Sequence, residues 1–152
     1  MTKAAQPRRS VARSTARLAA VQALYQRAME GTALAKVLDE FHQHRLGKNI
    51  DDEALAEAEV EFFDDIVSGV DARSEEIDTL VSQRLQQGWS LERLDKTLVQ
   101  ILRAGTYELL ARQDVPVGAV ISEYLDVAHA FFDDRETRFI NGVLDKIAKA
   151  VR

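Results

Sequence analysis

Proline occurs only twice in the 152 residues, at Pro7 and Pro116, so very little in the chain prevents helix formation. Apolar residues elsewhere recur at spacings of three and four, which is the repeat of a helix with one buried face. We find no convincing stretch that alternates apolar and polar residues as a half-buried strand would. The pattern therefore predicts an all-α fold.

The periodic stretches predict about seven helices joined by short connections. The first, fifth and last are expected at about residues 10–30, 91–112 and 136–151. Three helices follow residues with cap chemistry, namely Thr32, Ser90 and Asp133, the last forming a capping box with Glu136. No linker or repeat is visible. We therefore expect residues 1–152 to form a single compact domain with a basic flexible tail at about 1–9.

The composition is typical of a globular chain, with 46% apolar and 30% charged residues. No cysteine is present, which excludes disulfides and thiolate metal sites and favours a reducing compartment. No apolar run is long enough to cross a bilayer, and no apolar secretory core follows the basic start. We therefore expect a cytoplasmic protein that does not use a membrane.

Charge is distributed unevenly along the chain. Residues 1–29 contain six basic side chains and no acid, whereas the whole chain has a net charge of -5, so the remainder carries -11. This asymmetry suggests a local contact with a polyanion on a body that otherwise repels polyanions. Charge alone leaves a second interpretation open, a solvated basic tail without a ligand.

The basic residues of the first helix follow a regular spacing. Arg9, Arg13 and Arg17 step by four, so a helical wheel puts them in one stripe. Large apolar residues of this helix, such as Val21 and Leu24, place that stripe along the border of the expected buried face. Guanidinium groups in such a position suit the oxygens of a phosphate backbone.

Tyr25 lies at the far edge of the same apolar face. Its ring offers a surface on which a base can stack, an interaction that contributes about 1–3 kcal/mol per base in single-strand binders. The alternative is a core tyrosine with its hydroxyl at the surface. Because the cationic region is short and no tight helix-turn-helix stands out, single-stranded RNA is a better target than duplex DNA.

Four motifs stand out along the chain. They are "ARLAAVQALYQ" near the start, "LERLDKTLVQILRAGTYELL" in the middle, "VPVGAVISEYLDVAHAFF" after it and "RFINGVLDKIA" near the end. In this order they resemble the NusB family of bacterial transcription antitermination factors. The resemblance covers nearly the whole chain, and the last motif is the most specific because composition does not explain an Asn-Gly inside a helical frame.

The resemblance implies an all-α, NusB-like domain of two packed helical bundles that has no catalytic activity and no cofactor. Family members bind the boxA element of nascent RNA, best together with NusE, a small-subunit ribosomal protein. The complex joins an RNA polymerase assembly that resists termination, chiefly on ribosomal RNA operons. Some members pair with themselves and hide the RNA surface while others are monomers, so a homodimer stays open.

Two other interpretations also stay open. A NusB-like domain precedes the catalytic part of some ribosomal RNA cytosine methyltransferases. Against this, the chain has no Gly-rich nucleotide-binding region and no cysteine nucleophile. A helical scaffold that binds only protein would require the basic first helix to be incidental.

The family's RNA contacts can be carried over by position. The residues so implied are Arg8, Arg9, Arg13, Arg17, Tyr25, Arg135, Arg138 and Phe139. The chain departs from the family pattern in one respect. Many members have consecutive arginines, whereas Ser14 and Thr15 interrupt the row here and Arg8 extends the charge upstream.

Three further residues call for an interpretation. Gly105 and Gly142 lie inside predicted helices, where glycine costs about 1 kcal/mol relative to alanine. We expect both to allow close helix packing rather than to contact RNA. Trp89 is the only tryptophan and follows Gly88 in a turn. We expect it to plug the junction between the bundles, with a partner-binding anchor as the alternative.

Candidate metal and buried-acid positions give weak signals. His42 and His44 would point to different sides of a helix and have no evident third ligand, so no metal site is predicted. Glu123 is expected near the inner side of its helix. It either bonds to a buried donor such as Arg103 or is an ordinary solvated acid.

Overall fold

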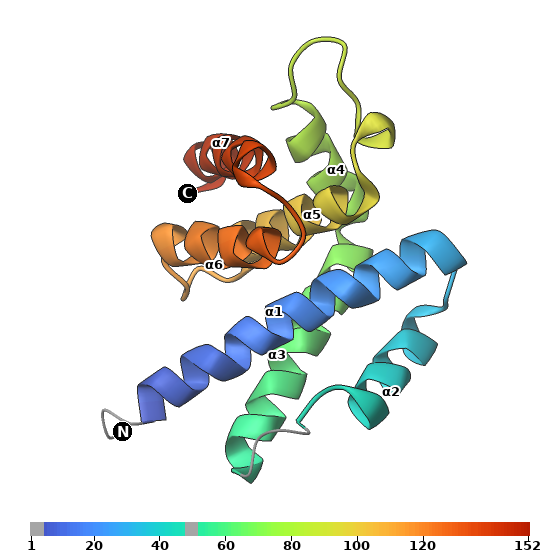
Figure 1. The fold of residues 1–152 in the computed structure, drawn as a ribbon, viewed down its shortest axis with the longest axis vertical. Helices are drawn as coiled ribbons and strands as arrows, with labels where there is room; N and C mark the ends of the chain where they lie inside the picture. Colours follow the sequence, from blue (N-terminus) through green and yellow to red (C-terminus); the bar gives the residue numbers. More distant parts are fainter. Residues whose placement is uncertain (1–4, 48–51) are drawn as a thin grey trace. The chain divides into compact units, whose positions relative to one another are not determined.

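The computed structural model describes residues 5–47 and 52–152, with side chains for all of these except residues 5–9, 54, 55 and 58 (Figure 1). Within the described residues the chain forms seven α-helices, one 3-10 helix and no strand, which confirms the predicted all-α fold. The elements are α1 Ala5–Glu30, α2 Leu34–His44, α3 Glu53–Ala72, α4 Ser74–Ser82, η1 Leu91–Arg93, α5 Lys96–Ala111, α6 Val117–His129 and α7 Asp134–Val151.

The chain divides into two compact units, residues 1–69 and 70–152, and the division falls near the end of α3. The first unit holds α1, α2 and most of α3. The second holds α4, η1, α5, α6 and α7. No helix in the described ranges combines the length and the apolar character that a bilayer span needs.

In the first unit, α1 is longer and turned differently from the prediction. It begins at Ala5 rather than Ser10, so the expected tail at about 1–9 is helical from Ala5 onward. Its buried face is built largely from small residues, namely Ala12, Ala16, Ala19, Ala20 and Ala23, together with Val21 and Leu24. Small side chains let a helix approach its neighbours closely. The buried side of α1 therefore lies nearer to the row of arginines than the positions of its large apolar residues predict.

The end of α1 is closed as expected. Gly31 has a φ of +70°, the left-handed conformation that glycine adopts freely, and its N–H donates to the carbonyl of Arg27 at 2.9 Å. The expected cap of the second helix is wrong, because Ala33 holds the N-cap position of α2 and provides no side-chain hydrogen bond. Thr32 instead accepts the Nε–H of Arg27 with its backbone carbonyl, at 3.1 Å.

Helix α2 runs back along α1 and is attached to both of its neighbours (Figure 1). Gln26 of α1 donates to the carboxylate of Glu40 in α2 at 2.9 Å. Phe41 of α2 stacks on Phe63 of α3, with ring centroids 5.3 Å apart. These contacts tie three helices into one bundle.

In the second unit α5 is the central helix, and α4, α6 and α7 all contact it (Figure 1). Sequence periodicity predicted its start at Leu91, but residues 91–93 form η1 and Leu94 is extended. The α-helix begins after Asp95, whose Oδ1 accepts the N–H groups of Thr97 and Leu98 at 2.8 and 3.1 Å. Ser90 and Asp133 hold the predicted N-cap positions of η1 and α7, but their side chains form no cap hydrogen bond, so the capping box expected at Asp133 is absent.

The two glycines that lie within helices have opposite surroundings. A Cβ added at Gly105 of α5 would lie 3.1 and 3.2 Å from the two Cδ atoms of Leu144 in α7, which is fully buried. A Cβ added at Gly142 of α7 would meet no atom within 4 Å. The packing role expected for Gly105 is confirmed, and the same role expected for Gly142 is wrong because its position faces open space.

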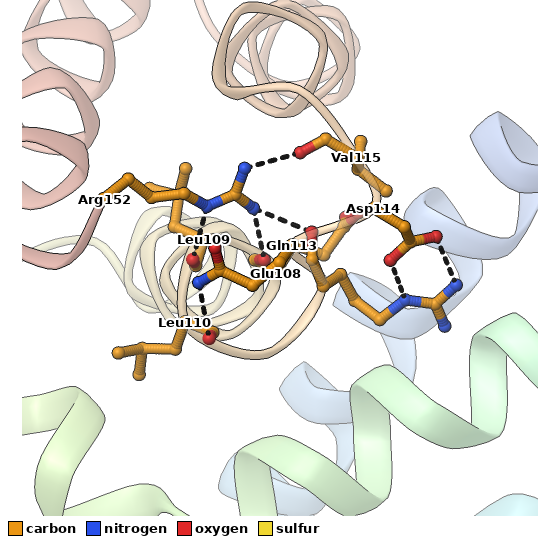
Figure 2. A network of polar contacts seen from close by, with 8 residues as sticks. Glu108, Leu109, Leu110, Gln113, Asp114, Val115 and Arg152 are labelled. Atoms are coloured by element: carbon orange, nitrogen blue, oxygen red, sulfur yellow. Dashed lines mark hydrogen bonds and ion pairs between the residues drawn. The ribbon is translucent and has the colours of Figure 1, made fainter.

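Arg152 closes the C-terminal end of α5 with its guanidinium group (Figure 2). Its nitrogens donate to four backbone carbonyls, those of Glu108, Leu109, Arg112 and Val115, at 2.7–3.1 Å. The last carbonyls of a helix have no partner within the helix and carry partial negative charge. One cation therefore satisfies these groups and joins the end of α7 to the end of α5.

We expect Gly105→Ala and Gly142→Ala to change stability in opposite directions. Gly142→Ala should raise the free energy of unfolding by up to about 1 kcal/mol, because alanine favours the helix and nothing obstructs its methyl group. Gly105→Ala should lower it by about 1–3 kcal/mol, because the buried Leu144 must move. Urea denaturation of both variants checks this, and a Gly105→Ala protein as stable as Gly142→Ala would contradict the close packing.

We expect Arg152→Ala to lower the free energy of unfolding by about 1–3 kcal/mol, because four carbonyls lose a charged donor and three of these hydrogen bonds are part-buried. Arg152→Lys should recover little of this, since an ammonium group cannot reach four carbonyls at once. Lys149→Ala is the matched control, because its exposed ion pair with Asp145 is worth less than about 1 kcal/mol. If Arg152→Lys is as stable in urea as the unmodified chain, the hydrogen bonds from the guanidinium group to the four carbonyls are unimportant for stability.

Candidate nucleic-acid interface

Two of the predicted RNA-binding arginines meet on one aromatic ring. Arg13 and Arg17 stand one turn apart on α1, and the Cζ atom of each lies 4.8 Å from the ring centroid of Phe62 in α3. The electron-rich face of a phenyl ring attracts cations, by about 0.5–2 kcal/mol for each contact. The ring therefore offsets part of the repulsion between two neighbouring guanidinium groups and holds both against α3.

Burial differs between these two arginines. Arg17 is only 3% exposed, whereas Arg13 is half-buried. The prediction placed both arginines at the border of the buried face, whereas Arg17 lies within the buried arc because the alanine-rich face of α1 is turned toward it. In this arrangement Arg17 fastens α1 to α3, and Arg13 presents the outer guanidinium.

The other predicted positions on α1 vary in how far the structure describes them. Tyr25 is 39% exposed, so it is a surface ring rather than a core residue. Arg8 and Arg9 belong to α1 by their backbone, but their side chains lie outside the described residues. Ser14 and Thr15, which interrupt the arginine row, donate their hydroxyl protons to the carbonyls of Ser10 and Val11, each at 2.9 Å.

A buried acid lies one turn before Phe62 on α3. Glu59 is 2% exposed, and burial raises its pKa, while a weak hydrogen bond at 3.4 Å from the backbone N–H of Gly47 acts in the opposite direction. Burial dominates because a carboxylate loses more solvation than one long hydrogen bond returns. Glu59 therefore attaches the segment after α2 to α3.

The remaining predicted positions lie in the second unit, on α7. Arg135 and Arg138 are exposed in its first turns, and the Nε–H of Arg138 donates to the carbonyl of Asp134 at 3.3 Å. Phe139 is half-buried and stands one turn after Arg135 on the same side of the helix. Thus α7 places a cation and a ring one turn apart on the same side.

Trp89 lies beside Phe139, a neighbour that the sequence did not predict. It is 50% exposed and stacks on Phe139, with ring centroids 5.9 Å apart and planes inclined by 28°. The role expected for it at the junction between bundles stays a prediction. Gly88, with a φ of +90°, makes the turn that places the ring here. The sequence did contain a signal for this exposure. Trp89 directly follows a turn glycine, and turns and loops lie on the protein surface.

The sequence compares closely with a known family. A sequence profile of the NusB family matches residues 14–149. Proteins named Transcription antitermination protein NusB from Novosphingobium aromaticivorans and Sphingopyxis alaskensis are 66% and 63% identical to the chain. The alignments cover 93% and 95% of this chain, and 95% and 97% of the two relatives.

Solved structures share the fold. A crystal structure of T. maritima NusB has a TM-score of 0.76 and 33% identity, covering 90% of this chain and 90% of that chain. A crystal structure of the antitermination factors NusB and NusE in complex with double-stranded RNA has a TM-score of 0.75 and 27% identity, covering 91% of this chain and 97% of that chain. By its sequence and its fold, this chain belongs to the NusB family.

Proposed function

We propose that this protein is an RNA-binding transcription antitermination factor that works together with a NusE-type ribosomal protein. Family membership is the observation that carries the proposal, supported by a relative of the same fold that has been crystallised with NusE and RNA. The relatives from Novosphingobium aromaticivorans and Sphingopyxis alaskensis match this chain over 95% and 97% of their own lengths. The similarity is thus to whole antitermination proteins rather than to one domain of a longer methyltransferase.

In this proposal the first unit contributes cations and a ring from α1. Arg13 and the exposed ring of Tyr25 contact the RNA, and Arg8 and Arg9 extend the positive charge toward the N-terminus. Arg17 acts from beneath, because its stack on Phe62 fixes the part of α1 that carries Arg13. Guanidinium groups recognise phosphate oxygens, and aromatic rings stack on unpaired bases.

The second unit contributes α7. Arg135 and Arg138 contact phosphates, and Phe139 contacts a base. Both units thus offer cations and an aromatic ring on one helix, Arg13 and Tyr25 on α1 and Arg135 and Phe139 on α7, which is the combination that single-stranded RNA binders use. The acidic remainder of the chain repels RNA elsewhere and confines it to these surfaces.

The finer proposal concerns the RNA and the assembly. We propose that the RNA is a single-stranded boxA element of a nascent ribosomal transcript, and that the complex acts on RNA polymerase in the cytoplasm. The protein acts by binding rather than by catalysis. NusE increases the contact area with the RNA, so it raises the affinity of the pair above that of either protein.

The proposal is tested by measuring the affinity of the chain for a single-stranded boxA RNA, with and without NusE. A scrambled RNA and a double-stranded version of the same element are the comparisons. We expect tight binding to the single strand, weaker binding to the other two and a further gain with NusE. Equal affinity for boxA and scrambled RNA in both conditions would refute the proposal, and a preference for the duplex would refute its single-strand part.

We expect Arg13→Ala to weaken RNA binding and to reduce its dependence on salt. Each lost phosphate contact on a single strand lowers the slope of log affinity against log salt concentration by about 0.7. Fluorescence polarisation at several salt concentrations measures both quantities. Lys36→Ala is the matched control, because it removes an exposed cation of α2 in the same unit and should change neither. An Arg13→Ala protein with the slope of the unmodified chain would exclude a phosphate contact at this position.

A further inference from the structure

The stack of Trp89 on Phe139 projects from the second unit with much of its surface uncovered. Trp89 belongs to the segment between α4 and η1, and Phe139 belongs to α7. Phe139 holds the indole ring on one side, yet half of the tryptophan remains exposed. The ring is thus fixed in position and still accessible to a ligand.

The surrounding face of α7 carries cations and an open position. Residues 135, 139, 142 and 146 follow spacings of four, three and four, so they form one row on the helix. Arg135, Gly142 and Lys146 in this row are exposed. At Gly142 an added Cβ would meet no atom within 4 Å. The row therefore presents a ring, bare helix backbone beside it and a cation toward each end.

The exposed ring of Trp89 and the glycine at position 142 both weaken the isolated fold. A large apolar ring left half in water loses part of the gain of burial. A glycine in a helix interior is unfavourable, and Gly142 has no packing neighbour that requires it. A ligand with flat rings and regularly spaced negative charges would use the ring, the open backbone and the cations together. Single-stranded RNA has that chemistry.

We propose that Trp89 and Phe139 form a base-stacking platform for single-stranded RNA. One nucleobase stacks on the exposed indole of Trp89 beside Gly142, and the adjoining phosphates reach Arg135 and Lys146. This inference rests on the proposed function and adds Trp89, Gly142 and Lys146 to the interface. Because every base has a flat face, the platform contributes affinity rather than sequence selection.

The chain contains one tryptophan, so its tryptophan emission reports on Trp89 alone. The experiment titrates the full chain with a short single-stranded boxA RNA. It records tryptophan emission and, with a labelled copy of the RNA, fluorescence polarisation. We expect the emission to be quenched by stacking, with the same midpoint that polarisation reports.

Substitutions at the platform separate stacking from a structural role. Trp89→Ala should weaken RNA binding about tenfold with an unchanged salt slope, and Trp89→Phe should recover most of the loss. Gly142→Gln should weaken binding several-fold without lowering the melting temperature, because the position faces open space. Phe131→Ala is the control, an exposed aromatic residue of the same unit outside the α7 row.

A set of RNAs that each lack one base extends the test. One of these RNAs should bind the unmodified chain about tenfold more weakly than the complete RNA does. The Trp89→Ala variant should bind that same RNA and the complete RNA equally well. If polarisation shows binding while emission and the affinity of Trp89→Ala stay unchanged, the platform is refuted and the proposed function stands. If emission responds to NusE and not to RNA, the ring is a protein contact and the platform is refuted. If the RNA does not bind at all, both proposals fail.

Discussion

The second unit depends on the burial of α5. Every residue from Leu98 to Leu109 except Arg103 is buried, and three other helices contact this one. The two ends of α5 lie nearer the surface than its middle, and side chains satisfy backbone groups at both ends. Asp95 closes the start of α5 and Arg152 closes its end. Arg152 holds the C-terminal end of α7 to α5. This contact fixes α7, the helix that carries Arg135, Arg138 and Phe139.

The first unit meets a related constraint, the placement of positive charge against a hydrophobic core. A helix with arginines one turn apart has two cations that repel each other and lose water when neighbours approach. Phe62 gives both guanidinium groups one aromatic ring to contact. The buried Arg17 thereby becomes part of the fold and the half-buried Arg13 stays at the surface. Two positions of one repeat in the sequence thus differ in burial, and only Arg17 is covered.

Local patterns predicted some features well and others badly, for definable reasons. The end of α1 at Gly31 and the start of α6 after Pro116 follow from backbone conformation, which neighbouring residues decide. The direction in which α1 faces differs from the prediction, which rests on the large apolar residues of this helix. The alanines of α1 are buried as well, and a residue that small gives little signal of its own.

The start of α5 shows a second kind of error. Leu94 continues the apolar repeat of the helix, so periodicity extended the helix back to Leu91. The backbone is extended at Leu94 instead, and the carboxylate of Asp95 caps the helix one residue later. A leucine can be buried from either conformation, so the apolar pattern does not distinguish them.

By itself the sequence determined the all-α fold, the concentration of positive charge at the start of the chain and the resemblance to the NusB family. Each of these is carried by residue type and spacing along one segment. Only the tertiary structure decided that Arg17 is covered, that Gly142 faces open space while Gly105 is packed, and that Trp89 stacks on Phe139. These outcomes depend on which side chains approach from elsewhere in the chain, and no local pattern contains that information.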